Sequence, residues 1–524
     1  MTAGKPGSWT FHGGLHLADH KAESLSEPLA KITLPKRLVV PLQQHIGAAA
    51  EPLVSAGDKV LKGQTIARAT QYIGAPIHAP ASGTVADISE QPVPHPSGLS
   101  APCIIIQTDT EQQWAELPEP LPHFEKLDPG LLRERVRWAG IVGLGGAAFP
   151  TSVKVNHGPD NPIDTLVING AECEPYITCD DMLMRTQADR VIEGIKILLH
   201  MVTTRECLIG VEDNKPEAIA ALTQAIEDAS LPRTRVISLP SKYPTGGEKQ
   251  LIQCLTGKQV PSHGIPAEIG VICLNVATTA AITDAVLAGR PLLQRIVTVT
   301  GKGVNRPRNL EVPFGTPIAH VIQQAGGYSK QINRLILGGP MMGFMLHDDQ
   351  VPVIKGANCL LAASADEAPE PGPAMPCIRC GKCADVCPAS LLPQQLYWYS
   401  RAKDLDKTHE YNLFDCIECG CCAYVCPSHI PLVQYYRYAK TASWAAEQEK
   451  QQSDNARRRH EARVARLERI KQERQANLRK KKAALEKKPA ADKDAKQAAI
   501  EAAMKRVAAK KQKATAEKQS REDA

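Results

Sequence analysis

The sequence predicts a multidomain α/β protein in which a small β unit, an α/β domain, a second β-rich unit, a cysteine-rich helical region and a basic tail follow one another. Three observations support this prediction. Short β-type runs alternate with turns in the first hundred residues, strands alternate with helices from residue 128, and nine of the 16 cysteines lie within 50 residues. At 524 residues the chain is also too long for one ordinary domain.

The first unit, expected over residues 1–127, contains short β-type runs bounded by turns. These are Arg37–Pro41, Pro52–Val60, Gln64–Ala67, Pro76–Ala81, Gly83–Ile88 and Cys103–Thr108. The phrases at 57–60 and 79–85 resemble the β hammerhead, or barrel-sandwich hybrid, of biotinyl and lipoyl domains. Those carrier domains bear a modifiable lysine at a hairpin tip, and the corresponding stretch 68–75 contains none. We therefore expect a structural role for this unit.

The α/β domain, expected over residues 128–292, alternates amphipathic and apolar segments. Helices are predicted at 131–139, 187–203 and 215–229, and strands at 165–169, 207–211 and 234–239. The apolar stretch 269–282 contains Asn and Thr, so it predicts a buried strand and turn. This alternation favours a mostly parallel sheet.

Three parts follow the α/β domain. Residues 293–361 have short strands, glycine turns and one predicted helix at 317–324. Residues 362–442 begin with a Pro/Ala/acidic linker and contain the cysteine-rich region. Residues 443–524 form an Ala/Lys-rich tail expected to be helical or disordered.

Eight cysteines form two copies of one motif, each ending in Cys-Pro. In such proteins three thiolates of one loop bind one 4Fe–4S cluster, and the fourth cysteine binds the other cluster. We therefore assign Cys377, Cys380, Cys383 and Cys426 to cluster 1, and Cys416, Cys419, Cys422 and Cys387 to cluster 2. Structural zinc is the alternative, but its sites are usually built from two CxxC pairs. Ile378 and Ile417 are expected to shield the cluster edges, and Cys421 is not expected to be a ligand.

A glycine-rich turn at residues 140–151 follows the first helix of the α/β domain. Its bare glycines would let backbone amides approach a phosphate or a flat ring. By itself such a turn is structural as often as it binds a nucleotide. Three polar turns, at 169–175, 243–249 and 275–278, add weight because they adjoin apolar segments, where α/β sheets form ligand sites.

These motifs, in this order, resemble the flavoprotein subunit of respiratory complex I. With the hammerhead, the phrase at 338–343 and the doubled cysteine motif, residues 9–443 are similar to the RnfC (RsxC) family of Rnf (Rsx) electron-transport complexes. Residues 297–327 resemble the soluble-ligand-binding β-grasp unit of both families. The resemblance implies noncovalent FMN with NADH stacked against it. It implies that Gly143, Gly145, Gly146 and Phe149 border the nucleotide, Lys154 the flavin phosphate, and Asn169, Glu172, Glu174, Tyr243, Glu248, Asn275 and Thr278 the flavin.

Four positions depart from the complex I pattern. Ala148 replaces a loop glycine, Ala171 an aspartate, and Gly247 and Ala277 each replace a glutamate. These departures bear above all on the nicotinamide contacts.

The expected activity is electron transfer, with no catalytic residue of its own. NADH delivers two electrons together and each cluster takes one, whereas a flavin can accept the pair and release it singly. We expect the order NADH, FMN, first cluster, second cluster and then a partner. The direction of flow does not follow from the sequence, because cluster potentials span roughly −700 to +450 mV. The resemblance implies a ferredoxin-level carrier and ion-translocating membrane subunits as partners.

The tail is strongly basic. Residues 451–524 contain 23 Lys and Arg against 11 Asp and Glu, a net charge of +12 in a chain whose total is +6. It is either a solvated extension or a segment attracted to an anionic membrane surface, at ~1 kcal/mol per basic residue near that surface. Nucleic acid is not expected as a partner, because no aromatic residue follows Trp444 to stack on bases.

The N-terminus lacks an apolar signal core, and no apolar run approaches the ~20 residues that span a bilayer. Metal-type cysteine spacing in such a chain indicates a reducing compartment. We therefore expect a peripheral protein on the cytoplasmic side of the bacterial inner membrane. Two other functions stay open: a soluble flavin and iron–sulfur cobalamin reductase, and a non-enzymatic iron–sulfur scaffold or redox sensor.

Overall fold

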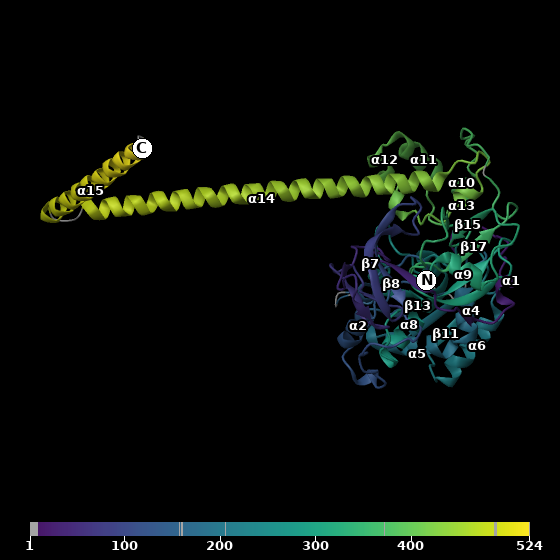
Figure 1. Cartoon of the computed structure of the whole chain (residues 1–524). Coiled ribbons are helices and arrows are strands. Elements are labelled where there is room, and N and C mark those ends of the chain that lie inside the picture. The colour runs from purple at the N-terminus through teal and green to yellow at the C-terminus, as the bar shows by residue number, and fades with distance from the viewer. Residues whose placement is uncertain are drawn as a thin grey trace. The chain divides into compact units, whose positions relative to one another are not determined.

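The computed structural model describes residues 9–522 apart from 157, 159, 160, 205, 371 and 487–489. The first eight residues of the expected β unit and Pro489 of the tail therefore lie outside the described residues. Contacts divide the chain into two units, Met1–Lys440 and Thr441–Ala524. Figure 1 labels the main elements.

The N-terminal β unit is a sandwich of two antiparallel sheets. One contains β2 (Arg37–Pro41), β8 (Ser100–Thr108), β7 (Gly83–Pro92) and β4 (Lys59–Val60), and the other β3 (Glu51–Pro52), β5 (Thr65–Arg68) and β6 (Ile77–His78). Inward-facing Val, Leu and Ile side chains fill the space between them. In the β5–β6 hairpin, the Tyr72 hydroxyl accepts a hydrogen bond from Asn156 of the α/β domain, 3.0 Å away. This contact supports a structural role for the hairpin.

The α/β domain contains a four-stranded parallel sheet in the order β11 (Thr234–Leu239), β10 (Glu206–Glu212), β9 (Thr165–Gly170), β12 (Val271–Asn275). One face packs on α2 (Pro129–Trp138), α5 (Ala188–Met201), α6 (Pro216–Asp228) and α8 (Val276–Leu287), and the other on α7 (Glu248–Thr256). The chain leaves β9 in both directions, so the strand order switches between β9 and β12. Asn169 and Asn275, at the carboxyl ends of these strands, are register partners. Ligands of α/β sheets bind at such a point.

The predicted turn after residue 275 is instead helix α8. The Asn275 side chain accepts hydrogen bonds from the backbone amides of Ala277 (2.9 Å) and Thr278 (3.4 Å), a standard N-cap that starts the helix. Two other helices were not expected: α4 (Cys179–Thr186) and α7.

The second β-rich unit is a six-stranded sheet with α9 (Ile318–Gln324) beside it. Its order is β1 (Ala30–Lys31), β14 (Arg308–Pro313), β13 (Gln294–Thr300), β17 (Cys359–Ala363), β15 (Arg334–Leu337), β16 (Phe344–Met345). Strand β1 lies parallel to β14 and follows α1 (Ala22–Leu25) in the N-terminal segment. That segment, expected within the hammerhead unit, therefore contributes a strand to the β-grasp sheet.

The cysteine-rich region consists of loops and short helices, which are α10 (Lys382–Asp385), α11 (Pro393–Ala402), α12 (Leu405–Glu410) and α13 (Cys421–Tyr424). Helix α14 (Leu432–Glu486) begins in the first unit, and α15 (Ala490–Glu522) follows it in the second. The tail is thus helical where it is described. Across the described helices, none combines the length and apolar character needed to cross a bilayer.

Candidate flavin and iron–sulfur sites

The two cysteine motifs share one backbone conformation. Corresponding residues adopt positive φ: Arg379 (56°) and Glu418 (57°) within the CxxC turns, Gly381 and Gly420 (both 82°) after them, and Ser390 (52°) and His429 (49°) after each Cys-Pro. Non-glycine residues rarely adopt this region, so the match marks a true structural repeat. The internal repeat inferred from the spacing is therefore present in the fold.

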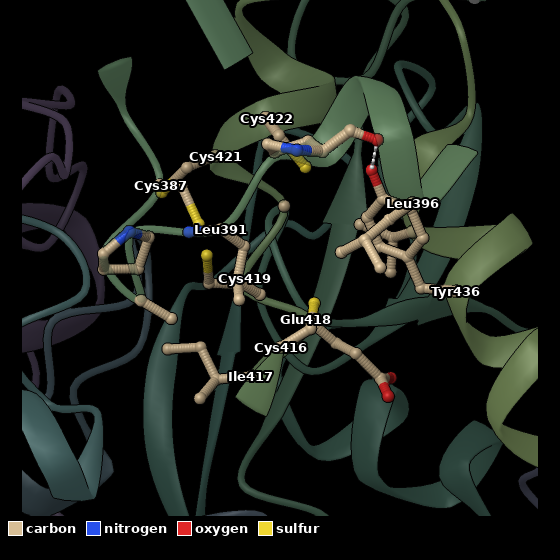
Figure 2. Close-up of a pocket in the computed structure, with 15 residues that line it drawn as sticks. Cys387, Leu391, Leu396, Cys416, Ile417, Glu418, Cys419, Cys421, Cys422 and Tyr436 are labelled. Atoms are coloured by element: carbon tan, nitrogen blue, oxygen red, sulfur yellow. Dashed lines mark hydrogen bonds between the residues drawn. The ribbon is translucent and has the colours of Figure 1, made fainter. Parts of the chain in front are cut away.

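Cysteines of both motifs meet around one apolar pocket, drawn in Figure 2. Cys387 of the first motif lies there with Cys416, Cys419 and Cys422 of the second. Ile417 also lines the pocket, whereas Cys421 is fully buried beside Cys419. The structure thus brings together the four cysteines assigned to cluster 2.

The cysteines assigned to cluster 1 lie nearer the surface. Cys377, Cys383 and Cys426 pack partly buried against the helical core of this region, and Cys380 is exposed. Ile378, expected to shield a cluster edge, is 68% exposed, and the space around Gly381 is open. The two sites therefore differ in environment although their loops match.

The thiols of the enclosed site suit a metal cluster better than free protons. Burial raises the pKa of Cys387, and it raises the pKa of Cys416 to about 11. A thiolate buried among carbon atoms needs a compensating positive charge, which iron supplies when it replaces the proton. The sulfur donor set and its apolar surroundings therefore fit a 4Fe–4S cluster.

The glycine-rich turn has a fixed base and an exposed tip. The amide of Gly143 donates to the carbonyl of Phe149 (2.8 Å), and the amide of Leu144 donates to the Thr278 hydroxyl (2.9 Å). Residues 145–147 are exposed, and open space surrounds the position of a Cβ on Gly146, whose φ is +111°. A side chain would fill that space, so the bare tip fits a nucleotide approaching the backbone.

The two strand-end asparagines lie on either side of the switch point and shape its loops. Asn169 donates to the carbonyl of Gly246 (2.8 Å), and Asn275 donates to Asp180 (2.6 Å). The Cβ of a residue at Gly145 would approach Asn275 to 3.3 Å. The glycine turn and both strand ends thus converge, as the resemblance implies.

Lys154 and Glu248 form an ion pair near this point. Burial opposes the charge of Lys154, yet the neighbouring carboxylate raises the pKa of this lysine overall. The pair joins the turn after the glycine loop to the first residue of α7. Lys154 therefore carries a fixed positive charge where the resemblance implies the flavin phosphate.

Three residues expected along the flavin make protein contacts instead. The Glu172 carboxylate accepts the amides of Asp180 (2.6 Å) and Asp181 (3.1 Å) at the start of α4. Glu174 accepts the amides of Met341 (2.7 Å) and Met342 (3.0 Å). The buried Tyr243 hydroxyl donates to the carbonyl of Cys419 (2.7 Å). Tyr243 thus joins the α/β domain to the second cysteine loop.

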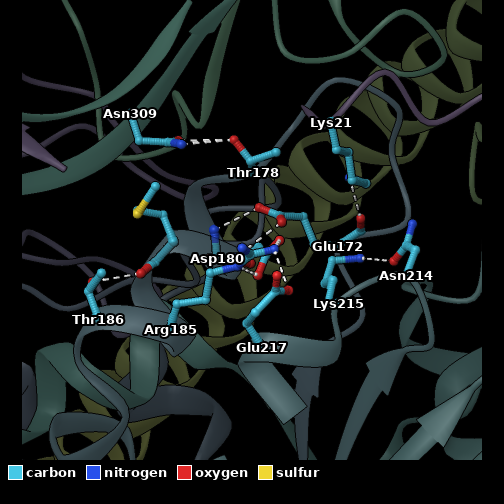
Figure 3. A network of polar contacts seen from close by, with 12 residues as sticks. Lys21, Glu172, Thr178, Asp180, Arg185, Thr186, Asn214, Lys215, Glu217 and Asn309 are labelled. Carbon is cyan, nitrogen blue, oxygen red and sulfur yellow. Dashed lines mark hydrogen bonds and ion pairs between the residues drawn. The ribbon is translucent and has the colours of Figure 1, made fainter. Parts of the chain in front are cut away.

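A buried polar network surrounds Glu172 (Figure 3). Lys21 donates to the carbonyls of Glu172 (2.9 Å) and Glu174 (3.0 Å), and burial lowers the pKa of this lysine. Burial likewise raises the pKa of Glu172 and Asp180. The sequence did not single out Lys21, because its partners are carbonyls about 150 residues away, which leave no sequence motif.

One departure from the complex I pattern has a structural counterpart. Ala148, which stands where that pattern has glycine, adopts a φ of 48°. The backbone therefore keeps the left-handed conformation that glycine favours, although the residue has changed.

Four family models match consecutive parts of the chain. They are the RnfC barrel sandwich hybrid domain (residues 9–111), the Nuo51 FMN-binding domain (136–284), the SLBB domain (296–345) and the 4Fe-4S dicluster domain (376–430). These matches confirm the expected fold class, and with it a 4Fe–4S dicluster domain and an FMN-binding domain.

Curated relatives are similar over most of the chain. The RnfC protein of the ion-translocating oxidoreductase complex of Pseudomonas aeruginosa is 50% identical over 466 residues, 89% of this chain and 60% of that protein. Its counterpart of the same name from Klebsiella pneumoniae is 49% identical over 476 residues, 91% of this chain and 62% of that protein. The chain thus spans about 60% of the length of these relatives.

Among solved structures, a chain of an NAD+-reducing NiFe-hydrogenase in the H2-reduced state matches at 19% identity and a TM-score of 0.44. The match covers 58% of this chain and 61% of that one. The doubled cysteine motif, the convergent flavin-type loops and the similarity along nine-tenths of the chain lead to one conclusion. The chain belongs to the RnfC family of ion-translocating oxidoreductase complexes, as its motifs predicted.

Proposed function

We propose that this protein is an electron-transfer subunit of a membrane-bound, ion-translocating oxidoreductase complex, and that it passes electrons between NADH, FMN and two 4Fe–4S clusters. One observation carries the proposal. Tyr243, in a loop of the FMN-binding domain, donates a hydrogen bond to the carbonyl of Cys419, in a cysteine loop of the dicluster domain. A flavin-type site and an iron–sulfur site are therefore in direct contact.

In this proposal Cys377, Cys380, Cys383 and Cys426 bind cluster 1, and Cys416, Cys419, Cys422 and Cys387 bind cluster 2. The meeting of Cys387 with the second-motif cysteines at one pocket supports that crossed assignment. Gly143, Gly145, Gly146, Phe149, Lys154, Asn169, Asn275 and Thr278 form or support the nucleotide site. Glu172, Glu174, Tyr243 and Glu248 act beside it by holding its loops.

The contacts favour cluster 2 as the cluster nearer the flavin, the reverse of the order expected from the sequence. Besides Tyr243, Lys249 of α7 pairs with Asp415 (3.2 Å), next to Cys416. Gln250 donates to the carbonyl of Pro388, next to Cys387 (3.4 Å). The exposed loop around Cys380 is then free to face a redox partner.

Within this proposal the chain supplies position and electrostatics. Bound FMN would convert between the two-electron chemistry of NADH and the one-electron chemistry of the clusters. The glycine turn offers backbone amides, Lys154 supplies a positive charge, and the apolar pocket around Cys387 and Cys416 excludes water. No side chain needs to act as an acid or base.

The decisive test uses the full chain, purified anaerobically with reconstituted clusters and added FMN. NADH should bleach the flavin absorption and then the broad visible absorption of the clusters. As a control, Cys387→Ser protein should keep flavin bleaching and lose part of the cluster signal. Cluster-loaded wild-type protein that binds FMN but is not bleached by NADH would contradict the enzymatic function and favour a scaffold or sensor.

Partners and location are part of the same proposal. The relatives are subunits of complexes, and we infer membrane subunits and a ferredoxin-level carrier as partners on the cytoplasmic side of the bacterial inner membrane. The exposed basic side chains of the tail support attraction to an anionic leaflet. Vesicles with anionic lipid should retain the full chain at low salt and release it at high salt, whereas a variant lacking 441–524 should not bind. Equal recovery of both in the supernatant would instead favour the soluble reductase.

A further inference from the structure

Two cations of the β-grasp unit lie buried beneath the glycine-rich turn. Arg295 is the second residue of β13, and Lys355 lies in the segment before β17. They are 5% and 1% exposed, and Lys355 is among the largest fully buried side chains. Among the residues that the structure describes, no carboxylate pairs with Lys355. Burying a charge is costly, so packing alone does not account for these side chains.

Both cations donate to main-chain carbonyls of the turn. The Lys355 ammonium donates to the carbonyl of Gly140 (2.6 Å) and to that of Pro76 in the hammerhead (3.2 Å). The Arg295 guanidinium donates to the carbonyl of Leu144 (2.8 Å) and to that of Lys355. Residues 140–144 are therefore held at both ends, by two residues that also contact each other.

The remaining contacts divide the turn into a fixed base and a free tip. The amides of Gly143 and Leu144 are bonded within the α/β domain, to Phe149 and Thr278. The backbone of Gly356, next to Lys355, lies where an added Cβ would be 3.6 Å from the carbonyl oxygen of Gly146. Residues 145–147 stay exposed. The β-grasp unit thus supports the side of the turn opposite the open tip.

We propose that Arg295 and Lys355 are positioning residues that hold residues 140–144 so that the tip at 145–147 presents its backbone to a phosphate-bearing nucleotide. This inference rests on the proposed function, and it gives the β-grasp unit a part in nucleotide binding. The ligand class is a flavin or nicotinamide nucleotide, because both carry phosphate groups that backbone amides bind.

The test compares Lys355→Met and Arg295→Met with Thr316→Val in the full, cluster-loaded chain. Thr316 is a buried residue of the same unit whose hydroxyl donates to Pro313 (2.8 Å) and does not touch the turn. Thr316→Val therefore removes a buried hydrogen bond at a matched but unrelated place. Hydrogen exchange of the Gly143 and Leu144 amides is measured first, without nucleotide, and the Kd for FMN is measured by fluorescence quenching.

Both Met variants should exchange these two amides about tenfold faster and bind FMN about tenfold more weakly, while their cluster absorption stays unchanged. Thr316→Val should change neither quantity. Unchanged exchange in the Met variants would overturn the proposal, and so would faster exchange with an unchanged Kd. If wild-type protein binds no FMN, the proposed function fails, and the exchange data still decide separately whether the two cations hold the turn.

Discussion

The buried ammonium of Lys355 predicts a pH-dependent stability that a methionine at this position should remove. Burial lowers the pKa of Lys355 from 10.5 to about 7. In the unfolded chain the lysine keeps its proton up to its ordinary pKa. Between pH 7 and about 10.5 the unfolded state therefore binds more protons than the folded state, and the stability of the folded state rises with pH.

The slope is about 1.4 kcal/mol per pH unit, and the whole interval amounts to ~5 kcal/mol. The other groups facing Lys355 are His45, His78 and Arg295. Burial lowers the pKa of both histidines, that of His78 to about 3, and both are present in the two proteins, so their titration cancels from the comparison. Arg295 keeps its charge throughout this range. The difference above pH 7 therefore reports on the lysine.

Urea unfolding of wild-type and Lys355→Met protein, followed by tryptophan fluorescence between pH 6 and 9.5, measures this effect. The absolute difference also contains the loss of donors to Gly140 and Pro76, which costs roughly 1–3 kcal/mol for each carbonyl left unpaired. That loss does not vary with pH. The difference between the two proteins should thus be flat below pH 6.5 and then move in favour of wild type. A difference that stays constant up to pH 9.5 would refute the assignment of a neutralised, buried lysine.

Three further changes test other parts of the structure. Ala148→Gly should stabilise the α/β domain by about 0.5–1 kcal/mol in urea unfolding, because glycine adopts the left-handed backbone at 148 without strain; a loss of stability would contradict that explanation. Tyr243→Phe leaves the Cys419 carbonyl without this donor and should cost ~1–2 kcal/mol. In stopped-flow experiments it should slow cluster reduction but not flavin reduction by NADH, and equal slowing of both steps would count against contact of cluster 2 with the flavin site. Cys387→Ser, although in the first motif, should disturb the electron paramagnetic resonance signal of cluster 2, and Cys426→Ser that of cluster 1; the opposite pattern would exclude crossed ligation.

The cysteine loops could be predicted in detail because cluster ligation imposes a local spacing. Cys416, Cys419 and Cys422 lie within seven residues, so the chemistry is written in a short stretch of sequence. The place of the nucleotide site was also predictable, since Asn169 and Asn275 end apolar strands. Their alignment across β9 and β12 needed only the usual topology of a parallel sheet.

Side-chain direction could not be predicted in the same way. Glu172 and Glu174 lie at the expected strand end, yet their carboxylates bind the start of α4 and the amides of Met341 and Met342. The support of the turn by Lys355 likewise depends on Gly140, more than 200 residues earlier. Backbone carbonyls are present at every residue, so a side chain that seeks one leaves no recognisable pattern.

The N-terminal segment connects the parts that form last with the part that is made first. The amide of Gly14 bonds the carbonyl of Val386 (2.9 Å), the backbone of Leu15 pairs with that of Tyr243 (2.8 Å), and β1 joins the β-grasp sheet. During synthesis at about 5–20 residues per second, Gly14 leaves the ribosome roughly 20 to 70 seconds before Val386 exists. Each core can form while the chain grows, but the segment that ties them together must wait unpaired until the first cysteine loop has been made. Assembly of the first unit is therefore completed only after the iron-binding region has been translated, at the stage when its clusters can be inserted.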